Sequence, residues 1–433
     1  MPYQQPLEQL RLFKDGETPR PTDTSSTFSD NLSLPIHRWF RYSAGFSALW
    51  VREVIEREKA VGRRRIFDPF AGSGTVLLEA ERAGVESSGV EAHPFIARVC
   101  RAKLWWKENP KQFLEFALDL LRKAESLTAE TGHYSDLIKK CFPEQALHQL
   151  SNLHRAWRDS ADPGPASELA WLALVSILRE CSPVGTAPWQ YLLPRKKKAK
   201  FREPFKAFQA KVYLMAQDMA IGQQAKTFTP AHLLQEDARE CASLPDSTFD
   251  LVITSPPYAN NYDYADATRL EMIFLGEISG WGDLQDSVRK YLVRSCTQHV
   301  SALKGTLEQM LEDPLLLPIQ PAISKVCHQL QKEKEFHGGK KNYDLMIASY
   351  FLDMSRVWRT LRRVTRKNCL VCFVIGDSAP YGVHAPIEQW LGELALTAGF
   401  SSYVFEKTRD RNIKWKNRKH RVPLQEGRLW VEG

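Results

Sequence analysis

The stretch Thr254-Ser255-Pro256-Pro257-Tyr258 follows the apolar run at residues 249–253 and decides the fold. The run Phe-Asp-Leu-Val-Ile is typical of a buried strand, and the two prolines end its hydrogen-bond ladder and stiffen the next loop. In open α/β sheets, ligands bind at the carboxyl ends of the strands. The loop offers a hydroxyl, a backbone carbonyl and an aromatic ring there, which suit a flat heterocycle carrying an exocyclic amine. Taken alone, the motif also fits a proline-rich turn whose tyrosine only packs.

A glycine-rich loop lies upstream. An expected strand at residues 65–67 leads into Asp68-Pro69-Phe70-Ala71-Gly72-Ser73-Gly74-Thr75 and then into a helix. Glycines let the backbone come close to a ligand. The loop lacks the third glycine of a dinucleotide fingerprint and the Gly-Lys-Ser/Thr of a phosphate loop. An acid at the strand end also suits a cationic ligand better than a pyrophosphate. Two further expected strands end in acids, at Glu91 and Asp237, and Glu91 is suitably placed for ribose hydroxyls.

Together the two motifs resemble those of the amino-methylating DNA methyltransferases, which use S-adenosylmethionine (SAM). The Ser-Pro-Pro-Tyr form is similar to the cytosine-N4 branch of that family. The resemblance covers the expected catalytic domain and implies an α/β fold, a Rossmann-like SAM-dependent methyltransferase sheet with helices on both faces. Asp68 would then serve the methionine ammonium region, Glu91 the ribose hydroxyls and Asp237 the adenine amine. The expected cofactor-binding residues are Asp68, Pro69, Phe70, Ala71, Gly72, Gly74, Thr75, Glu91, Asp237 and Thr254, with Trp39 and Tyr42 from the preceding segment.

Amino methylation needs acceptors for the two amine hydrogens, because the nitrogen lone pair of cytosine N4 or adenine N6 is delocalised into the ring. Ser255 Oγ and the Pro256 carbonyl are the expected acceptors, Pro257 stiffens the loop, and Tyr258 would stack on a base extruded from the duplex. No Pro-Cys dipeptide is present, so methylation of cytosine C5 has no candidate nucleophile in its expected motif. The reaction needs no metal. Adenine-N6 methylation, RNA amino-methylation and a non-catalytic nucleic-acid-binding subunit remain alternatives.

Composition agrees with a nucleic-acid partner without requiring one. The chain has 433 residues and a formal net charge of +8, and its eight cysteines show no zinc spacing. Cys369 and Cys372 fall in an apolar run that is typical of a buried strand. Neither a signal peptide nor a membrane-spanning run is evident. We therefore expect a soluble cytoplasmic protein that associates with the nucleoid through DNA.

The pattern along the chain predicts several parts. Residues 1–34 are expected to form a flexible arm, and residues 35–103 and 230–433 the catalytic domain. Helical spacing at 111–126, 144–158 and 167–179 predicts a helical insertion over 104–229, which could recognise the target. A second insertion is expected at 276–342.

DNA contacts are expected from a basic, aromatic-flanked run in the first insertion and from two loops. A solvated surface is the alternative for such a run. The expected partners are double-stranded DNA and a cognate restriction endonuclease, while the oligomeric state is not predicted. The candidate nucleic-acid-binding residues are Arg195, Lys196, Lys197, Lys198, Lys200, Arg202, Asn260, Asn261, Lys340 and Lys341.

Overall fold

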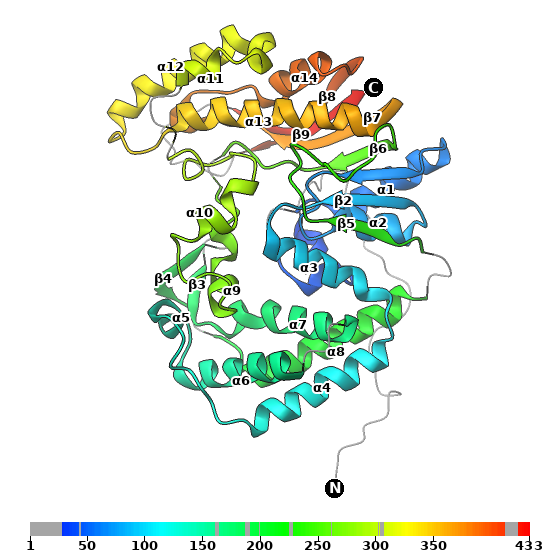
Figure 1. Cartoon of the computed structure of the whole chain (residues 1–433), viewed down its shortest axis with the longest axis vertical. Helices are drawn as coiled ribbons and strands as arrows, with labels where there is room; N and C mark the ends of the chain where they lie inside the picture. The colour runs from blue at the N-terminus through cyan, green and yellow to red at the C-terminus, as the bar shows by residue number, and fades with distance from the viewer. Residues whose placement is uncertain are drawn as a thin grey trace.

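A seven-stranded sheet forms the centre of the protein in the computed structural model (Figure 1). The structure describes residues 28–42, 45–160, 164–186, 191–198, 200–224, 228–260, 262–301, 303, 307–411 and 423–433. In spatial order the strands are β5 (Ala231–Leu234), β2 (Glu86–Val90), β1 (Arg65–Asp68), β6 (Phe249–Thr254), β7 (Thr365–Gly376), β9 (Leu424–Glu432) and β8 (Ser402–Arg411).

The strand order creates a switch point between β1 and β6. The chain runs from β1 outward through β2 to β5, and it then returns to place β6 and β7 on the other side of β1. These five strands are parallel, whereas β9 runs antiparallel to both β7 and β8. A parallel sheet with such a reversal leaves a crevice outside the carboxyl ends of the strands beside the switch point. The predicted methyltransferase-like α/β fold is confirmed.

Helices cover both faces of the sheet because neighbouring strand residues point to opposite sides. On one face, Ile66 and Leu251 pack with α1 (Ala48–Ala60) and α2 (Thr75–Arg82). On the other, Phe67 and Phe373 pack with α13 (Tyr343–Val364) and α14 (Ile387–Thr397). Trp358 of α13 stacks on Phe373 with 4.4 Å between the ring centroids. The sheet is therefore buried on both sides, as its apolar strands require.

The first insertion is a helical region with its own core. The predicted helices at 111–126, 144–158 and 167–179 are confirmed as α4, α6 and α7, and Figure 1 shows this region at the end of the molecule away from α12–α14. Its elements are α3 (Pro94–Leu104), α4 (Pro110–Ser126), α5 (Asp136–Cys141), α6 (Glu144–Ser160), α7 (Pro165–Cys181), the hairpin of β3 (Val184–Thr186) and β4 (Leu192–Lys197), and α8 (Pro204–Gly222).

Asp218 of α8 joins this helical region to the segment that precedes α1. Its buried carboxylate accepts hydrogen bonds from the Ile36 backbone N–H (3.1 Å), from Arg38 Nη2 (2.6 Å) and Nε (3.0 Å), and from Trp39 Nε1 (2.9 Å). Ile36 and Trp39 are fully buried in the same apolar cluster as α4, α7 and α8. The insertion and the cofactor side of the sheet are thus one packed body.

The second expected insertion does not form one unit. Its first part, with α10 (Leu284–Ser287), packs into the core of the helical region, as does α9 (Arg269–Phe274), which precedes it. Its later part, with α11 (Leu307–Leu311) and α12 (Gln320–Phe336), packs against α13. The remaining short elements are the 3₁₀ helices η2 (Phe28–Leu32), η3 (His37–Trp39), η4 (Trp105–Lys107), η5 (Asp266–Thr268), η6 (Arg289–Tyr291), η7 (Pro314–Ile319) and η8 (Pro380–Gly382).

The prediction of a flexible arm is wrong for residues 28–34, while residues 1–27 lie outside the described residues. Phe28–Leu32 forms η2, and the buried Asn31 amide donates to the Phe46 carbonyl at 2.8 Å. Its oxygen accepts from the Ala48 backbone N–H at 2.9 Å. The polar composition suggested an arm, but the polar side chain of Asn31 instead forms hydrogen bonds with the backbone at the start of α1.

All eight cysteines are unpaired and buried, and Cys369 and Cys372 lie in β7, as the apolar run predicted. No helix in the described ranges combines the length and the apolar character that a membrane crossing requires.

We expect Asp218→Ala to lower the free energy of unfolding by about 3 to 5 kcal/mol, because it leaves buried donors of Ile36 and Trp39 and a partly buried Arg38 charge without an acceptor. Urea unfolding followed by circular dichroism measures the effect. Asp119→Ala is the matched control, since Asp119 forms only exposed ion pairs on α4 and should cost less than about 1 kcal/mol. Equal losses in the two variants would contradict the assigned role of Asp218.

Candidate active site

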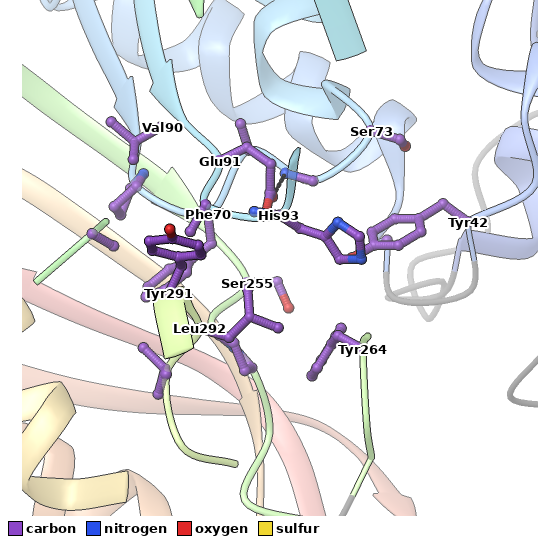
Figure 2. Close-up of a pocket in the computed structure, with 18 of the residues that line it drawn as sticks. Tyr42, Phe70, Ser73, Val90, Glu91, His93, Ser255, Tyr264, Tyr291 and Leu292 are labelled. Atoms are coloured by element: carbon purple, nitrogen blue, oxygen red, sulfur yellow. Dashed lines mark hydrogen bonds between the residues drawn. The ribbon is translucent and has the colours of Figure 1, made fainter. Parts of the chain in front are cut away.

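A pocket opens at the carboxyl ends of β1, β2 and β6, beside the switch point. It encloses about 730 Å³ of empty space, including its open mouth. Figure 2 shows side chains of the glycine loop, the end of β2, the Ser255 loop and the segment at 291–292 converging on it. Its lining comprises Tyr42, Gly45, Phe46, Pro69, Phe70, Ala71, Gly72, Ser73, Thr75, Val90, Glu91, Ala92, His93, Asp237, Ala238, Ser255, Pro257, Tyr264, Tyr291, Leu292 and Val293.

The glycine loop forms one wall in a conformation that glycine permits. Gly72 and Gly74 have φ of 53° and 88°, in the left-handed region. A Cβ on Gly74 would lie 2.7 Å from Cys100 Sγ, and one on Gly72 would lie 3.1 Å from the Tyr42 ring. The backbone therefore passes close to α3 and to Tyr42, and α2 begins at Thr75, directly after the loop.

Asp68 lies at the end of β1 and has one carboxylate oxygen without a partner. Its Oδ1 accepts from the Thr254 hydroxyl at 2.6 Å and from the Phe70 N–H at 3.0 Å. Its Oδ2 is buried and has no hydrogen-bond partner among the described residues. Burial raises the pKa of Asp68 to about 7, although these two hydrogen bonds lower it. Asp68 and Thr254 stand behind the pocket lining rather than in it, and the unpaired oxygen fits the donor groups of a cationic ligand.

Glu91 lines the pocket at the end of β2 and holds the glycine loop. Its Oε2 accepts from the Gly72 N–H and its Oε1 from the His93 N–H, both at 2.8 Å. Burial raises the pKa of Glu91 to about 7, while the backbone N–H groups lower it. His93 also lines the pocket, and its Nε2 lies 2.8 Å from Thr268 Oγ1.

Asp237 also lines the pocket, but a neighbour already occupies its carboxylate. Arg239 Nε lies 2.9 Å from each oxygen, and the Arg239 backbone N–H donates to Oδ1 at 2.9 Å. Arg239 further contacts Asp353 of α13 at 3.3 Å. Asp237 is thus held rigidly at the pocket edge, and an adenine amine there would share it with a guanidinium.

The Ser255–Tyr258 loop brings Ser255 and Pro257 to the opposite wall, whereas Tyr258 lies outside the pocket lining. The Ser255 hydroxyl donates to the Val374 carbonyl of β7 at 3.2 Å, so its hydrogen is committed and its oxygen is left as an acceptor. Ser255 and Pro257 line the pocket, and Pro256 is buried behind them. The Tyr258 N–H donates to the Tyr264 hydroxyl at 3.3 Å, which ties the loop to another pocket residue.

An arginine covers the ring of Tyr258. The Arg411 guanidinium carbon, at the end of β8, lies 5.4 Å from the ring centroid. Arg411 Nη1 donates to the Asp377 carbonyl at 3.1 Å. A Cβ on Gly376 would meet Arg411 Nη1 at 2.6 Å and Tyr258 Cε2 at 3.3 Å, so the glycine at the end of β7 makes room for both groups.

Several predicted site residues lie elsewhere. Trp39 does not line the pocket, because its ring is fully buried and its indole N–H is bound to Asp218. Asn261 and the Arg195 side chain fall outside the described residues. Asn260, Lys340 and Lys341 are exposed, away from the pocket lining. Conversely, no local pattern indicated Tyr264, Tyr291, Leu292 or Val293 as lining residues, since they come from irregular segments.

The basic run lies on and after the β3–β4 hairpin, beside the loop that follows Tyr258. The Tyr191 hydroxyl accepts from the Asp263 N–H at 2.6 Å, and its ring lies 5.6 Å from that of Tyr262. Lys196, Lys197 and Lys200 are exposed. Lys198 instead donates to the Arg179 carbonyl at 2.7 Å, and Arg202 pairs with Glu180 at 3.3 Å. Lys196, Lys197 and Lys200 form no ion pair with any described residue, whereas Lys198 is hydrogen-bonded and Arg202 is ion-paired.

Two known proteins are similar to this chain over most of its length, although no family model matches it. The type II methyltransferase M.BsoBI of Geobacillus stearothermophilus is 25% identical over 449 aligned residues, which cover 92% of this chain and 86% of that protein. The type II methyltransferase M.AvaI of Anabaena variabilis is 26% identical over 412 residues, covering 87% and 81%. The type II methyltransferase M.MjaII of Methanocaldococcus jannaschii is 30% identical over 97 residues, only 22% of this chain.

The pocket fits the cofactor of this group. It presents a glycine loop and a pocket-lining carboxylate at Glu91, with the unpaired oxygen of Asp68 behind the lining, at the edge of the sheet where such folds bind ligands. The predicted SAM cofactor is confirmed by the relatives. The chain is therefore similar to type II methyltransferases over most of its length, and its mostly parallel sheet agrees with that similarity.

Proposed function

We propose that this protein transfers a methyl group from SAM to the exocyclic N4 amine of cytosine in double-stranded DNA. The observation that carries the proposal is the Ser255 hydroxyl, whose hydrogen bond to the Val374 carbonyl leaves its oxygen to accept from an amine at the pocket wall. The relatives named type II methyltransferases support a role in modifying DNA alongside a cognate restriction endonuclease.

The loop supports the reaction mainly by positioning. Bound SAM supplies an electrophilic methyl group. Ser255 Oγ and the Pro256 carbonyl would accept the two amine hydrogens, which frees the nitrogen lone pair from conjugation with the ring. As the nitrogen–methyl bond forms, the sulfonium–methyl bond would break and leave S-adenosylhomocysteine. The nitrogen would release one proton to water, because a serine hydroxyl and a backbone carbonyl orient the amine but are not basic enough to keep its proton. The loop would hold the amine in this orientation before the reaction begins. The reaction step then no longer includes the cost of restricting the rotation of the amine or of reorganising solvent around it.

Tyr258 is the proposed stacking surface for the extruded base. The Arg411 guanidinium covers its ring, so a base that stacked on that face would displace the guanidinium. Displacement would break the 3.6 Å contact of Arg411 to Glu426 and its hydrogen bond to the Asp377 carbonyl. We propose that the freed guanidinium then contacts DNA, whose charge would compensate for the lost contacts.

The product identity tests the branch assignment. Nucleoside mass spectrometry of DNA treated with enzyme and SAM should show N4-methylcytosine, because Ser255 replaces the acid of the related motifs. N6-methyladenine would overturn only the choice of base. 5-Methylcytosine would overturn the mechanism. RNA as the preferred substrate would overturn the assignment of DNA.

Replacing Ser255 by alanine should lower kcat by about 10² to 10³, because it removes one preorganised acceptor of the amine. SAM affinity, measured by calorimetry, should change little. Ser255→Asp is the matched variant: it restores an acceptor and should retain more activity than Ser255→Ala. If the alanine variant keeps full activity, Ser255 has only a packing role.

SAM affinity should fall as the pH falls through about 7. Burial raises the pKa of Glu91 to about 7. The ribose hydroxyls need the ionised carboxylate as their acceptor, so below this pH the binding of SAM must release the proton from Glu91. The dissociation constant should rise about tenfold from pH 8 to pH 6 if one proton is released. Calorimetry across this range measures it. Glu91→Gln should bind more weakly and show a flatter pH profile; an unchanged profile in that variant would exclude Glu91 as the titrating group.

Neutralising Lys196, Lys197 and Lys200 to glutamine should weaken DNA binding equally for all sequences. Each lost phosphate contact lowers the slope of log K against log salt by about 0.9, so the slope should fall by about 2.7. Lys325→Gln with Lys332→Gln is the control, because these exposed lysines lie on α12 at the other end of the molecule (Figure 1). If the triple variant keeps the parent slope, the basic run is a solvated surface.

A further inference from the structure

Three potential metal ligands meet in the interior beside the loop that follows Tyr258. Asp263 comes from that loop, and Cys296 and His299 come from the segment after the pocket residues Tyr291–Val293. One carboxylate oxygen, the thiol sulfur and one ring nitrogen lie within 4.8 Å of one another, and all three residues are buried. None of them has a part in the proposed methyl transfer.

The imidazole ring of His299 lacks the hydrogen bonds that a buried polar group normally forms. Its side chain is fully buried, and neither Nδ1 nor Nε2 has a hydrogen-bond partner among the described residues. The Nε2 atom lies 3.8 Å from Asp263 Oδ1, which is too long for a hydrogen bond. Buried polar groups without partners are costly and rare in folded proteins. A cation between the two atoms would satisfy both lone pairs.

Cys296 places a buried sulfur beside the other two groups. The His299 backbone N–H donates to the Cys296 carbonyl at 3.1 Å and closes a tight turn between the two residues. This turn brings the thiol and the imidazole to the same side. Metal binding displaces the thiol proton, so the sulfur would bind as a thiolate.

Arg289 fixes the orientation of the third ligand. Its Nε and Nη2 donate to Asp263 Oδ2 at 3.1 and 2.7 Å. Oδ1 accepts from the backbone N–H groups of Ala265 and Asp266 at 3.2 and 3.4 Å and lies 3.8 Å from His299 Nε2. Hydrogen bonds to the non-ligating atom of a metal ligand are a regular feature of protein metal sites.

We propose that Asp263, Cys296 and His299 bind one Zn²⁺ ion, with water as the fourth ligand. The mixture of sulfur, nitrogen and oxygen ligands and the tetrahedral preference of zinc match this set. Metal–ligand bonds of about 2.0 to 2.3 Å place neighbouring ligand atoms about 3.3 to 3.7 Å apart, so the cluster needs to contract by about 1 Å. The thiolate and the carboxylate neutralise the ion, and Arg289 keeps its pairing with Oδ2.

The ion would be structural. It would link the loop after Tyr258, which contributes Tyr264 to the pocket, to the segment that contributes Tyr291, Leu292 and Val293. Both walls of the SAM pocket would then be fixed to each other at a point outside the reaction. The inference does not depend on which base is methylated.

Metal analysis of the full-length protein tests the proposal. After dialysis into metal-free buffer, inductively coupled plasma mass spectrometry should find one zinc ion per chain. Co²⁺ added to chelator-treated protein should give the near-ultraviolet charge-transfer band of a thiolate ligand. Zn²⁺ should also raise the Tm of that protein.

Variants distinguish this site from adventitious binding. Cys296→Ser should lose the charge-transfer band, and Cys296→Ser and His299→Gln should both lose the zinc-dependent rise in Tm. Cys327→Ser should retain both signals, because Cys327 is equally buried but lies on α12 beside the Asp344 carbonyl. Circular dichroism checks that each variant folds. Wild-type protein that binds no more Zn²⁺ or Co²⁺ than Cys296→Ser, or a Cys327→Ser variant that loses the signals, would overturn the proposal.

Discussion

The hydrogen bond from the Thr254 hydroxyl to Asp68, 2.6 Å long, joins the two strands on which the site depends. It connects the carboxyl ends of β1 and β6, the neighbours at the switch point of the sheet. The glycine loop leaves from one of these strand ends and the Ser-Pro-Pro-Tyr loop from the other. Because the bond is buried, it fixes the distance between cofactor loop and catalytic loop in an environment where water cannot compete for it. The other Asp68 oxygen is left for a ligand.

Local signals in the sequence were sufficient for the centre of the fold and for much of the site. Apolar runs that end in an acid or in Ser-Pro-Pro-Tyr predicted β1, β2, β6 and the pocket residues that follow them. Trp39 was misplaced because an aromatic residue before the glycine loop has the same pattern whether it contacts a ligand or packs in a core. Its partner, Asp218, lies on a distant helix, and no local spacing connects the two. Tyr291–Val293 reach the pocket from a segment without periodicity, and Arg411 reaches Tyr258 from the far edge of the sheet.

The helical region and the sheet both contribute segments that surround the site. The β3–β4 hairpin brings Tyr191 against the loop after Tyr258, and α9 and α10 pack into the helical core before the chain returns to line the pocket. Exposed lysines of the hairpin thus lie close to the catalytic loop without forming part of it. The proposed phosphate contacts and the proposed base contacts therefore come from different segments of the chain.

The Asp218 junction also bears on how the chain is made. Ile36 and Asp218 are separated by 182 residues, so the ribosome synthesises the hydrogen-bond donors near Ile36 long before it synthesises their acceptor, Asp218. At typical elongation rates of about 5 to 20 residues per second, that interval lasts roughly 10 to 40 seconds. During that interval Trp39 and its apolar neighbours have been synthesised, but the helix that completes their core has not. Completion of the cofactor side therefore waits for α8 to emerge, which makes the nascent chain a natural client for chaperones that shield exposed apolar segments.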